Sequence, residues 1–374
     1  MSGEGPGGAG RKALVVLHEE PLGGASMAVL RILPELEDRG WRIAFWAPNP
    51  SPLHRHLRAL GHEVHGADRP LAHSWRGLRQ PPGPARRVLR APGYLARFAA
   101  TVRRLRPDVV HANSLLSTWE AVTARAAGAR VVLYVHEMLG STPKATAAGC
   151  AARAGAHVVV AVSEACARSL ARVGIDARVV PGGVPAPAEP ASREGASQAI
   201  GTIGTISRRK GSDLFVEAAR RVRARDNEVG AEMIGSTEAP LEQEWIAGVL
   251  ELAARAGVRH RASADVQAAL ASWDVFVLPS REDPFPSVVL EAMAAGVPVV
   301  AAGVDGVPEQ VGDEAGLLVP AEDPGALADA VLDLLGSPSR RRAMGAAGRW
   351  RVGERFTLSK QAEGIHAAYL EACR

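Results

Sequence analysis

Cysteine, lysine and aromatic residues are all scarce in this sequence of 374 residues. The three cysteines, Cys150, Cys166 and Cys373, form no CxxC pair. An odd, scattered set of this kind excludes a disulfide framework and a thiolate zinc site, and it is typical of a reducing compartment. Aromatic residues make up only 4% of the chain, so aliphatic side chains must fill the core.

Lysine occurs at four positions, and the other 40 of the 44 basic residues are arginine. We attribute this bias, together with the abundant alanine, to genome composition. A net charge of +4 is too small at this length to indicate a nucleic-acid partner. No window approaches about 18 uninterrupted apolar residues, which argues against a transmembrane helix. The polar, glycine-rich start at Met1–Lys12 carries no apolar stretch, so we expect no secretory signal and a cytoplasmic protein.

The sequence does have length and a regular alternation of short apolar runs with amphipathic ones. Its 374 residues predict two domains, and 47% hydrophobic residues are enough to fill their cores. The apolar runs are continuous and β-branched, as parallel strands covered on both faces must be. In the first half we predict strands at Ala13–Leu17, Arg42–Trp46, Asp108–His111, Arg130–Val135 and His157–Val162, with helices at Ala25–Arg39, Ala85–Leu105 and Leu115–Ala127.

The alternation breaks at Pro181–Glu194, where four prolines without periodicity indicate a linker. It resumes with strands predicted at Ile200–Ile206, Ala231–Ile234, Asp274–Leu278, Val297–Ala301 and Leu317–Val319. The helices predicted between them are Ser212–Arg225, Leu241–Ala256, Val266–Ser272, Ser287–Ala295 and Gly325–Leu335. A βαβα rhythm of this kind implies a doubly wound parallel sheet, so each half is predicted to be an α/β, Rossmann-like domain.

These patterns predict the domain boundaries. We expect a disordered N-terminus at 1–12, a first domain at 13–184, a linker at 185–198 and a second domain at 199–355. A ligand in such an architecture belongs at the carboxyl ends of the strands, in a cleft between the two domains.

The most informative stretch is Val277–Val300. A strand ends there at Pro279, a proline-rich turn with Asp283 follows, and Ser287 is placed to cap a helix that holds Glu291 about one turn further on. The free N–H groups and the positive dipole end of a helix start suit a phosphate. Two carboxylates beside a phosphate site are expected to accept hydrogen bonds from hydroxyl groups, such as those of a ribose and a sugar. The alternative is a plain turn residue at Asp283 and a solvated helix carboxylate at Glu291.

This stretch resembles the E-x7-E region of the family-4 retaining glycosyltransferases, which have the GT-B fold of two facing Rossmann-like domains. The resemblance implies that the first carboxylate contacts the donor sugar and the second the ribose of the nucleotide. The spacing from Asp283 to Glu291 matches, with Asp in place of the usual first Glu, whereas Glu282 is out of register by one. The similarity continues through Gly303–Glu309 and Gly316–Pro324. The donor-binding residues that it implies between the two carboxylates are Pro284, Phe285, Pro286 and Ser287.

A second match lies at Gly201–Asp213, which reads as a strand, a turn and a helix start. Family members usually carry an arginine and a lysine here, and both hold the donor diphosphate. Lys210 aligns with the lysine, whereas Thr205 stands where the arginine is often found, so the contact is expected to pass to Arg209 or Arg208. A lysine and an arginine at a strand end can neutralise the charge that builds on a diphosphate leaving group. The alternative is a solvated basic turn.

Two further matches lie in the first half. The paired glycines Gly23 and Gly24 let backbone amides approach a ligand closely, and the resemblance places their loop against the diphosphate and the donor sugar. A purely steric need for glycine is the alternative. His136 ends a predicted strand where the family has a histidine on the acceptor side of the donor sugar, although a strand-end histidine can also be structural. The residues expected beside it on the acceptor side are His111, Asn113 and Glu137.

The resemblance covers nearly the whole chain from Ala13. It implies a metal-independent hexosyltransferase that moves a sugar, with retention, from a nucleotide-diphosphate donor to an acceptor hydroxyl, with UDP as the expected nucleotide. It also implies that there is no cofactor, that a helix at 356–374 crosses back onto the first domain, and that the acceptor is a saccharide, a lipid-linked glycan or a small natural product. Catalysis is expected to depend on leaving-group stabilisation and acceptor placement by four residues, His136, Asp283, Lys210 and Arg209.

Three alternatives remain at this stage. A nucleotide-sugar epimerase or a phosphorylase has the same architecture, and a sugar-binding protein without turnover belongs to a different functional class. A dinucleotide-dependent dehydrogenase is disfavoured because no G-x-G-x-x-G follows a predicted strand.

An arginine-rich stretch is not explained by the resemblance. Between Arg69 and Pro107 there are ten arginines and no acidic residue, interleaved with apolar residues that include Tyr94, Leu95 and Phe98. A basic amphipathic segment fits an acidic acceptor or peripheral contact with an anionic membrane, with these three residues available for insertion. The alternative is an ordinary solvated helix in an arginine-rich proteome.

Overall fold

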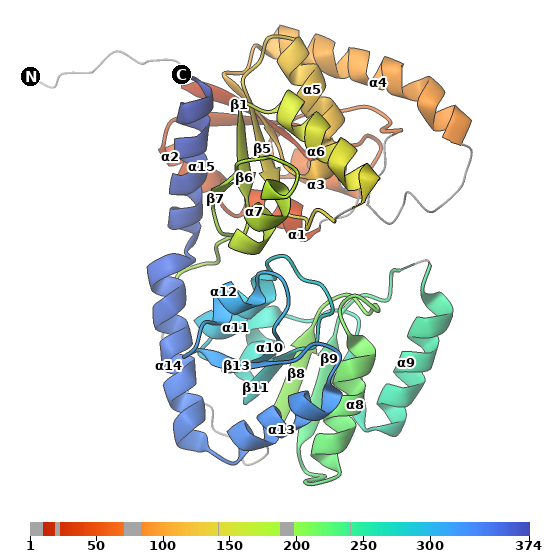
Figure 1. The fold of residues 1–374 in the computed structure, drawn as a ribbon, viewed down its shortest axis with the longest axis vertical. Coiled ribbons are helices and arrows are strands. Elements are labelled where there is room, and N and C mark those ends of the chain that lie inside the picture. The colour runs from red at the N-terminus through yellow and green to blue at the C-terminus, as the bar shows by residue number, and fades with distance from the viewer. Residues whose placement is uncertain (1–9, 19–22, 71–83, 141, 188–197, 240) are drawn as a thin grey trace, which may run out of the picture. The chain divides into compact units, whose positions relative to one another are not determined.

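The computed structural model describes residues 10–18, 23–70, 84–140, 142–187, 198–239 and 241–374. The chain divides into two compact units, Met1–Pro181 with Leu358–Arg374 and Gly182–Thr357 (Figure 1). The predicted N-terminal disorder and linker lie outside the described residues at 1–9 and 188–197. Within the described part, Arg11 already begins a strand, so the prediction of disorder up to residue 12 is wrong at that point. Val184 bridges to Thr357 and therefore belongs to the second unit.

The first unit is built on a seven-stranded parallel sheet in the order β3-β2-β1-β4-β5-β6-β7. Its strands are β1 (Arg11–Val16), β2 (Trp41–Trp46), β3 (Glu63–His65), β4 (Val109–Ala112), β5 (Val131–Val135), β6 (Val158–Ala161) and β7 (Arg178–Val179). Its helices are α1 (Gly24–Leu30), α2 (Leu33–Asp38), α3 (Pro52–Ala59), α4 (Pro84–Leu105), the 3-10 turn η2 (Leu115–Ser117), α5 (Thr118–Ala126), α6 (Pro143–Gly155), α7 (Glu164–Ala171) and α15 (Leu358–Ala372). Figure 1 shows α5 and α6 on one face of this sheet and α2 with α15 on the other.

The second unit is built on a six-stranded parallel sheet in the order β10-β9-β8-β11-β12-β13. Its strands are β8 (Ala199–Ile203), β9 (Gly230–Ile234), β10 (Val258–Arg261), β11 (Val275–Leu278), β12 (Val299–Ala302) and β13 (Gly316–Val319). Its helices are α8 (Ser212–Arg223), α9 (Gln243–Arg255), α10 (Val266–Ala271), α11 (Ser287–Ala294), α12 (Val307–Val311), α13 (Pro324–Leu335) and α14 (Pro338–Arg355). The predicted α/β class with two doubly wound parallel sheets is therefore confirmed.

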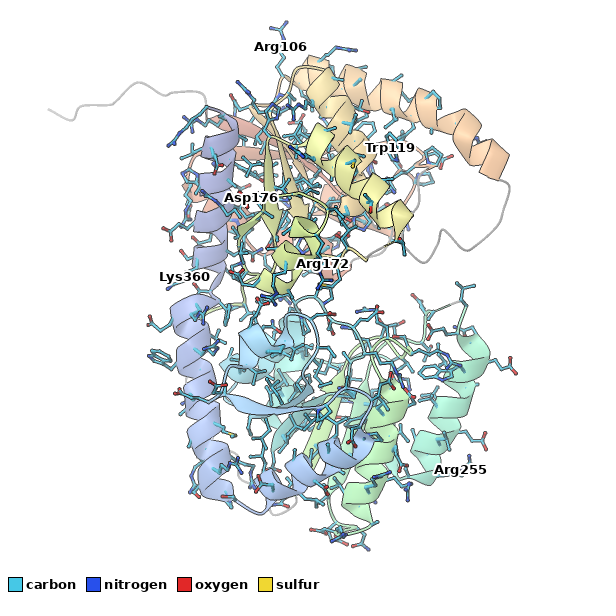
Figure 2. The ribbon with its side chains drawn as sticks, in the orientation of Figure 1. Arg106, Trp119, Arg172, Asp176, Arg255 and Lys360 are labelled. Atoms are coloured by element: carbon cyan, nitrogen blue, oxygen red, sulfur yellow. The ribbon has the colours of Figure 1, made fainter. Side chains whose placement is uncertain are left out.

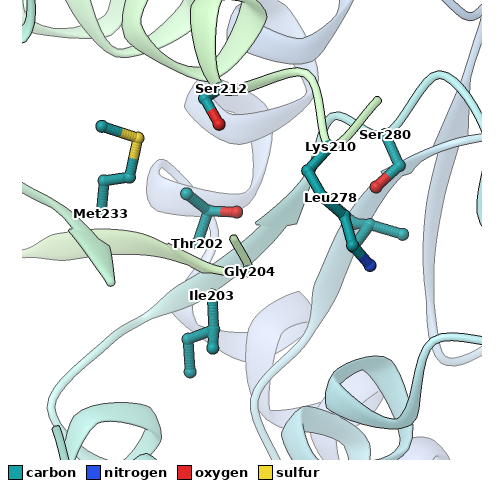
Figure 3. Close-up of a pocket in the computed structure, with 8 residues that line it drawn as sticks. All are labelled: Thr202, Ile203, Gly204, Lys210, Ser212, Met233, Leu278 and Ser280. Carbon is teal, nitrogen blue, oxygen red and sulfur yellow. The ribbon is translucent and has the colours of Figure 1, made fainter. Parts of the chain in front are cut away.

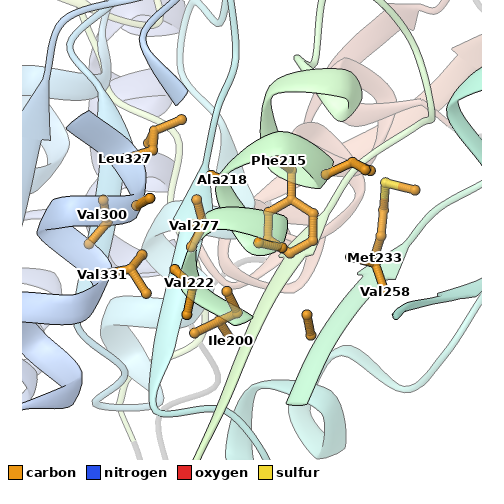
Figure 4. Packing of buried hydrophobic residues seen from close by; sticks show 14 of the residues in the cluster. Ile200, Phe215, Ala218, Val222, Met233, Val258, Val277, Val300, Leu327 and Val331 are labelled. Carbon is orange, nitrogen blue, oxygen red and sulfur yellow. The ribbon is translucent and has the colours of Figure 1, made fainter. Parts of the chain in front are cut away.

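Side chains of the second sheet alternate between two buried clusters, as the two-residue period of a strand requires. In β11, Val277 packs into one cluster with Phe215 of α8 and Leu327 of α13, part of which is shown in Figure 4. The next residue, Leu278, packs into the other cluster with residues of α10, α11 and α12, among them Leu290. Because both faces are covered, the strand is a continuous apolar run, which is why the sequence pattern predicts it.

The strands that sequence patterning does not predict, β3, β7 and β10, are short and lie at sheet edges, whereas the helices that it does not predict include α3, α6 and α7. β3 and β10 are edge strands with polar residues, Glu63-Val-His and Val258-Arg-His-Arg, so neither forms an apolar run. The predicted single helix Ala25–Arg39 is two helices, because Pro34 has no backbone N–H to donate and lies in the first turn of α2.

The C-terminal helix returns to the first unit, as the crossover prediction requires. After α14 the chain enters α15, which packs on α2, β5 and β6. Its Tyr369 ring meets the Trp41 ring edge to face at 4.8 Å between centroids, and Trp41 Nε1 donates to His366 Nδ1 at 2.9 Å. Among the described helices, none has the length and apolarity needed to cross a membrane.

Candidate functional site

A hollow lies at the carboxyl ends of β8 and β11 in the second unit, next to the start of α8. It is lined by Thr202, Ile203, Gly204, Lys210, Ser212, Met233, Leu278 and Ser280 (Figure 3). The turn before α8 passes so close to β11 that a Cβ on Gly211 would lie 2.0 Å from the Pro279 carbonyl oxygen. Gly211 also has φ 66°, so glycine is required there by both space and backbone conformation. This tight turn places the Lys210 side chain beside the end of β11.

An ion pair joins the two loops at this edge. Lys210 Nζ lies 2.6 Å from Asp283 Oδ2, and the hydroxyl of Ser280 donates to the same oxygen at 3.0 Å. Arg209 Nη1 lies 3.9 Å from Asp283 Oδ1 and donates to the carbonyl oxygen of Glu282 at 3.0 Å. The Asp283 side chain is only 6% exposed. The structure therefore brings together three of the predicted catalytic residues.

Arg208 and Thr205 lie apart from this cluster. The Arg208 guanidinium stacks over the Trp245 ring of α9, with 5.0 Å from Cζ to the ring centroid, and its backbone N–H donates to Glu242. Thr205 is exposed. Of the two arginines that could take over the diphosphate contact, Arg209 is thus the one beside the carboxylate.

Arg281 is a residue that sequence reasoning missed. Its guanidinium binds both carboxylate oxygens of Asp213 at 2.8 Å, and its Nε lies 2.6 Å from Glu322 Oε1. It also donates to the carbonyl oxygen of Arg208 at 2.7 Å. The hydrogen bonds to Asp213 are the main cause that raises the pKa of Arg281. Arg281 therefore clamps the turn that carries Arg209 and Lys210 to the loop that carries Asp283.

Asp305 was also missed, although it lies inside a matched segment. Its backbone has φ 45°, a left-handed conformation that is costly for a residue with a side chain. Its Oδ2 accepts a hydrogen bond from the backbone N–H of Asp283 at 2.7 Å. Burial raises the pKa of Asp305, with the neighbouring carboxylates adding to the effect. The strained turn thus fixes the position of the Asp283 backbone.

The start of α11 differs from the prediction in one respect. Pro286 occupies the N-cap position and no side chain caps the helix, so the predicted capping by Ser287 is wrong. Proline has no side-chain acceptor for the free N–H groups of the helix start. Its carbonyl oxygen accepts a hydrogen bond from Gln310 Nε2 at 3.0 Å. Pro284 and Phe285 are half-buried, and the Phe285 ring lies 5.8 Å from that of Phe356.

Glu291 lies one turn into α11 and is only 7% exposed. This burial excludes a solvated helix carboxylate.

In the first unit, a cluster of buried polar groups lies at the ends of β4 and β5. Asn113 Oδ1 is 3.2 Å from His111 Nε2 and 3.1 Å from His136 Nε2. The other nitrogen of His111, Nδ1, is 2.7 Å from the hydroxyl of Tyr369 on α15. Asn113 Nδ2 donates to the carbonyl oxygen of Ala25, one residue beyond the paired glycines, at 2.8 Å. The structure thus brings His111, Asn113 and His136 together.

Both histidines of this cluster are neutral at physiological pH. Burial lowers the pKa of His111 to about 4. Burial, and to a smaller extent the nearby His111, lowers the pKa of His136 to about 3. Each ring therefore carries one N–H and one lone pair.

Glu137 is held by its surroundings rather than by the His136 ring. Its carboxylate accepts hydrogen bonds from the Ser114 hydroxyl, from the Leu115 backbone at 3.2 Å and from the His136 backbone at 3.0 Å. It therefore braces the loops after β4 and β5.

Two family models match the chain, one in each unit. Residues 22–186 match the Glycosyltransferase Family 4 model, and residues 197–337 match the model of the Glycosyl transferases group 1. Among solved structures, Anabaena HepE in complex with UDP and glucose aligns with a TM-score of 0.80 at 20% identity, over 96% of this chain and 98% of that one. Sucrose-phosphate synthase from Thermosynechococcus elongatus aligns with a TM-score of 0.76 at 21% identity, over 96% and 98%. This chain has the GT-B fold, and each of its units contains a region that matches a glycosyltransferase family model.

The GT-B chain is also similar in sequence to curated bacterial proteins. A D-inositol 3-phosphate glycosyltransferase from Segniliparus rotundus is 34% identical over 186 residues, which cover 47% of this chain and 40% of that protein. The lipopolysaccharide core mannosyltransferase LpsB from Rhizobium meliloti is 31% identical over 182 residues, which cover 46% and 52%. The matched stretch thus spans about half the length of these relatives.

The glycine loop of this GT-B chain is open. Gly23 is the N-cap of α1, and a Cβ on Gly24 would meet nothing within 4 Å among the described residues. Packing of the described residues therefore gives no steric reason for glycine at position 24.

The arginine-rich stretch is divided between core and surface. Arg69 is buried against Glu120, with Nε 2.8 Å from Oε1, and the hydroxyl of Tyr94 donates to the same oxygen at 2.8 Å. Tyr94 and Phe98 are 4% and 0% exposed and pack in the core, so of the three residues considered for apolar insertion only the half-buried Leu95 is partly accessible. Arg97, Arg103, Arg104 and Arg106 of this stretch are exposed, and Arg106 extends from the end of α4 (Figure 2). Arg76 and Arg79 lie outside the described residues.

Within the part of the chain that the structure describes, no group of three or more His, Cys, Asp or Glu side chains is arranged to hold a metal ion.

Proposed function

We propose that this protein is a retaining, metal-independent glycosyltransferase that moves a hexose from a nucleotide diphosphate to an acceptor hydroxyl. The observation that carries the proposal is the cluster of Lys210, Arg209 and Asp283 at the carboxyl ends of β8 and β11. This edge of a doubly wound sheet is where ligands bind. The domain that holds the cluster matches a glycosyltransferase family model.

Each residue has a proposed role in the transfer. Lys210 and Arg209 bind the diphosphate and stabilise the charge that develops on it as the bond to the sugar breaks. Glu291 accepts hydrogen bonds from the ribose hydroxyls, and Asp283 from a hydroxyl of the donor sugar. His136 helps to place the sugar and the acceptor, so the rate depends on positioning and leaving-group stabilisation rather than on a protein nucleophile.

The comparisons support a UDP-sugar as the first donor to test. HepE was solved with UDP and glucose, whereas a Corynebacterium glutamicum relative that is 40% identical over 110 residues is a GDP-mannose-dependent mannosyltransferase. GDP-mannose is therefore the second donor. For the acceptor we propose a saccharide, a lipid-linked glycan or a small natural product, with transfer taking place in the cytoplasm.

A panel of nucleotide sugars read by thermal shift and by turnover tests the proposal. A ligand that binds only the native state stabilises it by RT ln(1 + [L]/Kd), about 2.7 kcal/mol at 100 Kd. We expect one nucleotide sugar to raise the Tm of the wild type and to have a much smaller effect on Lys210→Ala. Arg208→Ala is the matched control, since this cation stacks on Trp245 and its variant should keep the shift.

Three results would contradict the proposal. They are epimerisation of the donor without transfer, sugar release that requires inorganic phosphate, and saturable binding of a saccharide with no effect of any nucleotide sugar.

A further inference from the structure

We propose that Tyr369 is a positioning residue that fixes the protons of a buried relay, Tyr369–His111–Asn113–His136, so that His136 presents the lone pair of Nδ1 to a substrate hydroxyl. The identification of that hydroxyl as one of a sugar rests on the proposed function. The proton positions follow from the geometry of the described residues alone.

The orientation of the Asn113 amide determines the rest. Asn113 is fully buried, and the carbonyl oxygen of Ala25 can only accept. The nitrogen of the amide must therefore face Ala25, and its oxygen faces the two imidazole rings. An amide oxygen cannot donate, so His111 Nε2 and His136 Nε2, at 3.2 and 3.1 Å from it, must both carry a hydrogen.

The tautomer of His111 assigns a role to Tyr369. A neutral His111 with its hydrogen on Nε2 has a lone pair on Nδ1, which lies 2.7 Å from the Tyr369 hydroxyl. Tyr369 must therefore donate. Burial raises the pKa of Tyr369, so the hydroxyl keeps the proton that it donates. The Tyr369 hydroxyl, on α15, thus holds His111 in the one tautomer that can donate to Asn113.

The same reasoning leaves His136 with a free acceptor. Its hydrogen is on Nε2, so Nδ1 carries the lone pair, and that nitrogen makes no hydrogen bond to the residues that the structure describes. Residue His136 is half-buried, unlike His111 and Asn113, which are fully buried. His136 is therefore the member of the relay that meets a ligand, and it accepts from a hydroxyl rather than donating to one.

Removing the Tyr369 hydroxyl removes the constraint. In Tyr369→Phe the lone pair of His111 Nδ1 is buried without a donor, which favours moving the hydrogen to Nδ1. His111 Nε2 then becomes an acceptor that faces the Asn113 oxygen. The amide can relieve this clash only by turning over, which costs the hydrogen bond to Ala25 and places its oxygen against that carbonyl oxygen. The two arrangements therefore compete, and we expect a part of the molecules to turn over. An amide nitrogen facing His136 in turn favours the His136 tautomer with its hydrogen on Nδ1.

Tyr134 provides a matched control. It is a second fully buried tyrosine of the same unit, and its hydroxyl donates to the Val180 carbonyl oxygen at 2.8 Å rather than to the relay. Its ring packs against His136 at 4.2 Å between centroids, and this packing is kept in Tyr134→Phe. Each variant loses one buried hydroxyl and no ring.

The test is a long-range 1H–15N spectrum of the full chain with 15N-labelled histidine at neutral pH. Signals of His111 and His136 are assigned from His111→Gln and His136→Gln. We expect both histidines to be Nε2–H in the wild type and in Tyr134→Phe, and a population of Nδ1–H at His136 in Tyr369→Phe. The proposal is overturned by Nδ1–H at His136 in the wild type, by no change in Tyr369→Phe, or by an equal change in the two variants.

Steady-state kinetics of the same two variants provide a second, independent test. In Tyr369→Phe we expect kcat/KM for the nucleotide sugar to fall about tenfold, as for the loss of one hydrogen bond, and a fall of less than threefold in Tyr134→Phe. An equal fall in the two variants counts against the relay. If no nucleotide sugar is turned over by the wild type, the proposed function fails, and the spectra still decide the relay.

Discussion

Lys210 Nζ and Asp283 Oδ2 lie 2.6 Å apart, so the cation that we assign to the donor diphosphate is already held by a carboxylate. The pair is partly buried, at 18% and 6% exposure of the two side chains. A phosphate that binds Lys210 must compete with Asp283, whereas a sugar hydroxyl that donates to Asp283 relieves that competition. We therefore expect binding of the complete donor to be favoured over binding of the nucleotide alone.

Asp283→Asn tests this coupling. The change removes the competing charge and weakens the acceptor for a sugar hydroxyl, so affinity for UDP should rise and affinity for the UDP-sugar should fall. Calorimetry with both ligands measures the affinity for the UDP-sugar divided by the affinity for UDP. We expect this ratio to fall about tenfold, because a hydrogen bond to a charged group contributes roughly 1.5–3 kcal/mol. Ser280→Ala, which removes only the hydroxyl beside Asp283, is the control and should leave the ratio unchanged. A parallel change of both affinities in Asp283→Asn would show that the carboxylate does not touch the sugar.

Glu291→Gln should weaken nucleotide binding about tenfold or more, since the charge of a ribose acceptor is lost while its size is kept. The adjacent carboxylate Glu282 is exposed and out of register, and Glu282→Gln is therefore the matched control. Kd values for the nucleotide, measured with circular dichroism to check the fold, decide the matter. Equal Kd values for wild type and Glu291→Gln would remove the ribose assignment.

The two carboxylates of the candidate site were predicted from the resemblance of Val277–Val300 to an E-x7-E region, because their spacing alone left a plain turn residue and a solvated helix carboxylate as alternatives. Asp305 and Arg281 were not, because their partners Asp283 and Asp213 lie 22 and 68 residues away and a single loop residue has no periodicity. The arginine-rich stretch illustrates the same point. Nothing local distinguishes Arg69, which is buried against a glutamate 51 residues away, from its exposed neighbours.

The strands, too, divide into those that the sequence pattern predicts and those that it does not. β11 and β12 are covered on both faces and are therefore apolar throughout, so their existence could be read from composition. The edge strands β3 and β10 gain their structure from one neighbour each and have no apolar run to indicate them.

Turnover should persist in excess EDTA. The proposed cations for the diphosphate are Lys210 and Arg209, which a chelator does not remove. The assay is transfer rate with and without EDTA on the same preparation. Loss of activity that Mg²⁺ or Mn²⁺ restores would assign the diphosphate charge to a metal instead.

The free energy of unfolding should fall as the pH drops from 6.5 to 4. The pKa of His111 is about 4 in the folded chain and near 6.5 when unfolded, so the unfolded state binds more protons in this window. One such group contributes about 1.4 kcal/mol per pH unit, or roughly 3 kcal/mol over the window. Urea unfolding of the wild type, His111→Gln and the exposed control His56→Gln measures the slope. A slope that is the same in all three proteins would mean that His111 is not buried neutral.

The exposed arginines in the second half of α4 and just after it should bring the protein to anionic surfaces. The guanidinium groups of Arg97, Arg103 and Arg106 form no hydrogen bond or ion pair with the residues that the structure describes. Each exposed arginine near an anionic bilayer contributes on the order of 1 kcal/mol, and salt screens the effect. We expect sedimentation with anionic vesicles at low ionic strength, weaker sedimentation at physiological salt, and none with neutral vesicles.

A matched pair of triple variants distinguishes binding through these arginines from attraction caused by the total net charge. Replacing Arg97, Arg103 and Arg106 by glutamine should abolish sedimentation. The control replaces three exposed arginines of the second unit, Arg225, Arg255 and Arg342, and lowers the net charge by the same amount. If both variants lose vesicle binding equally, attraction is a property of the total charge, and the end of α4 is an ordinary solvated surface. Sedimentation of the wild type with neutral vesicles would point to apolar contact, which the burial of Tyr94 and Phe98 argues against.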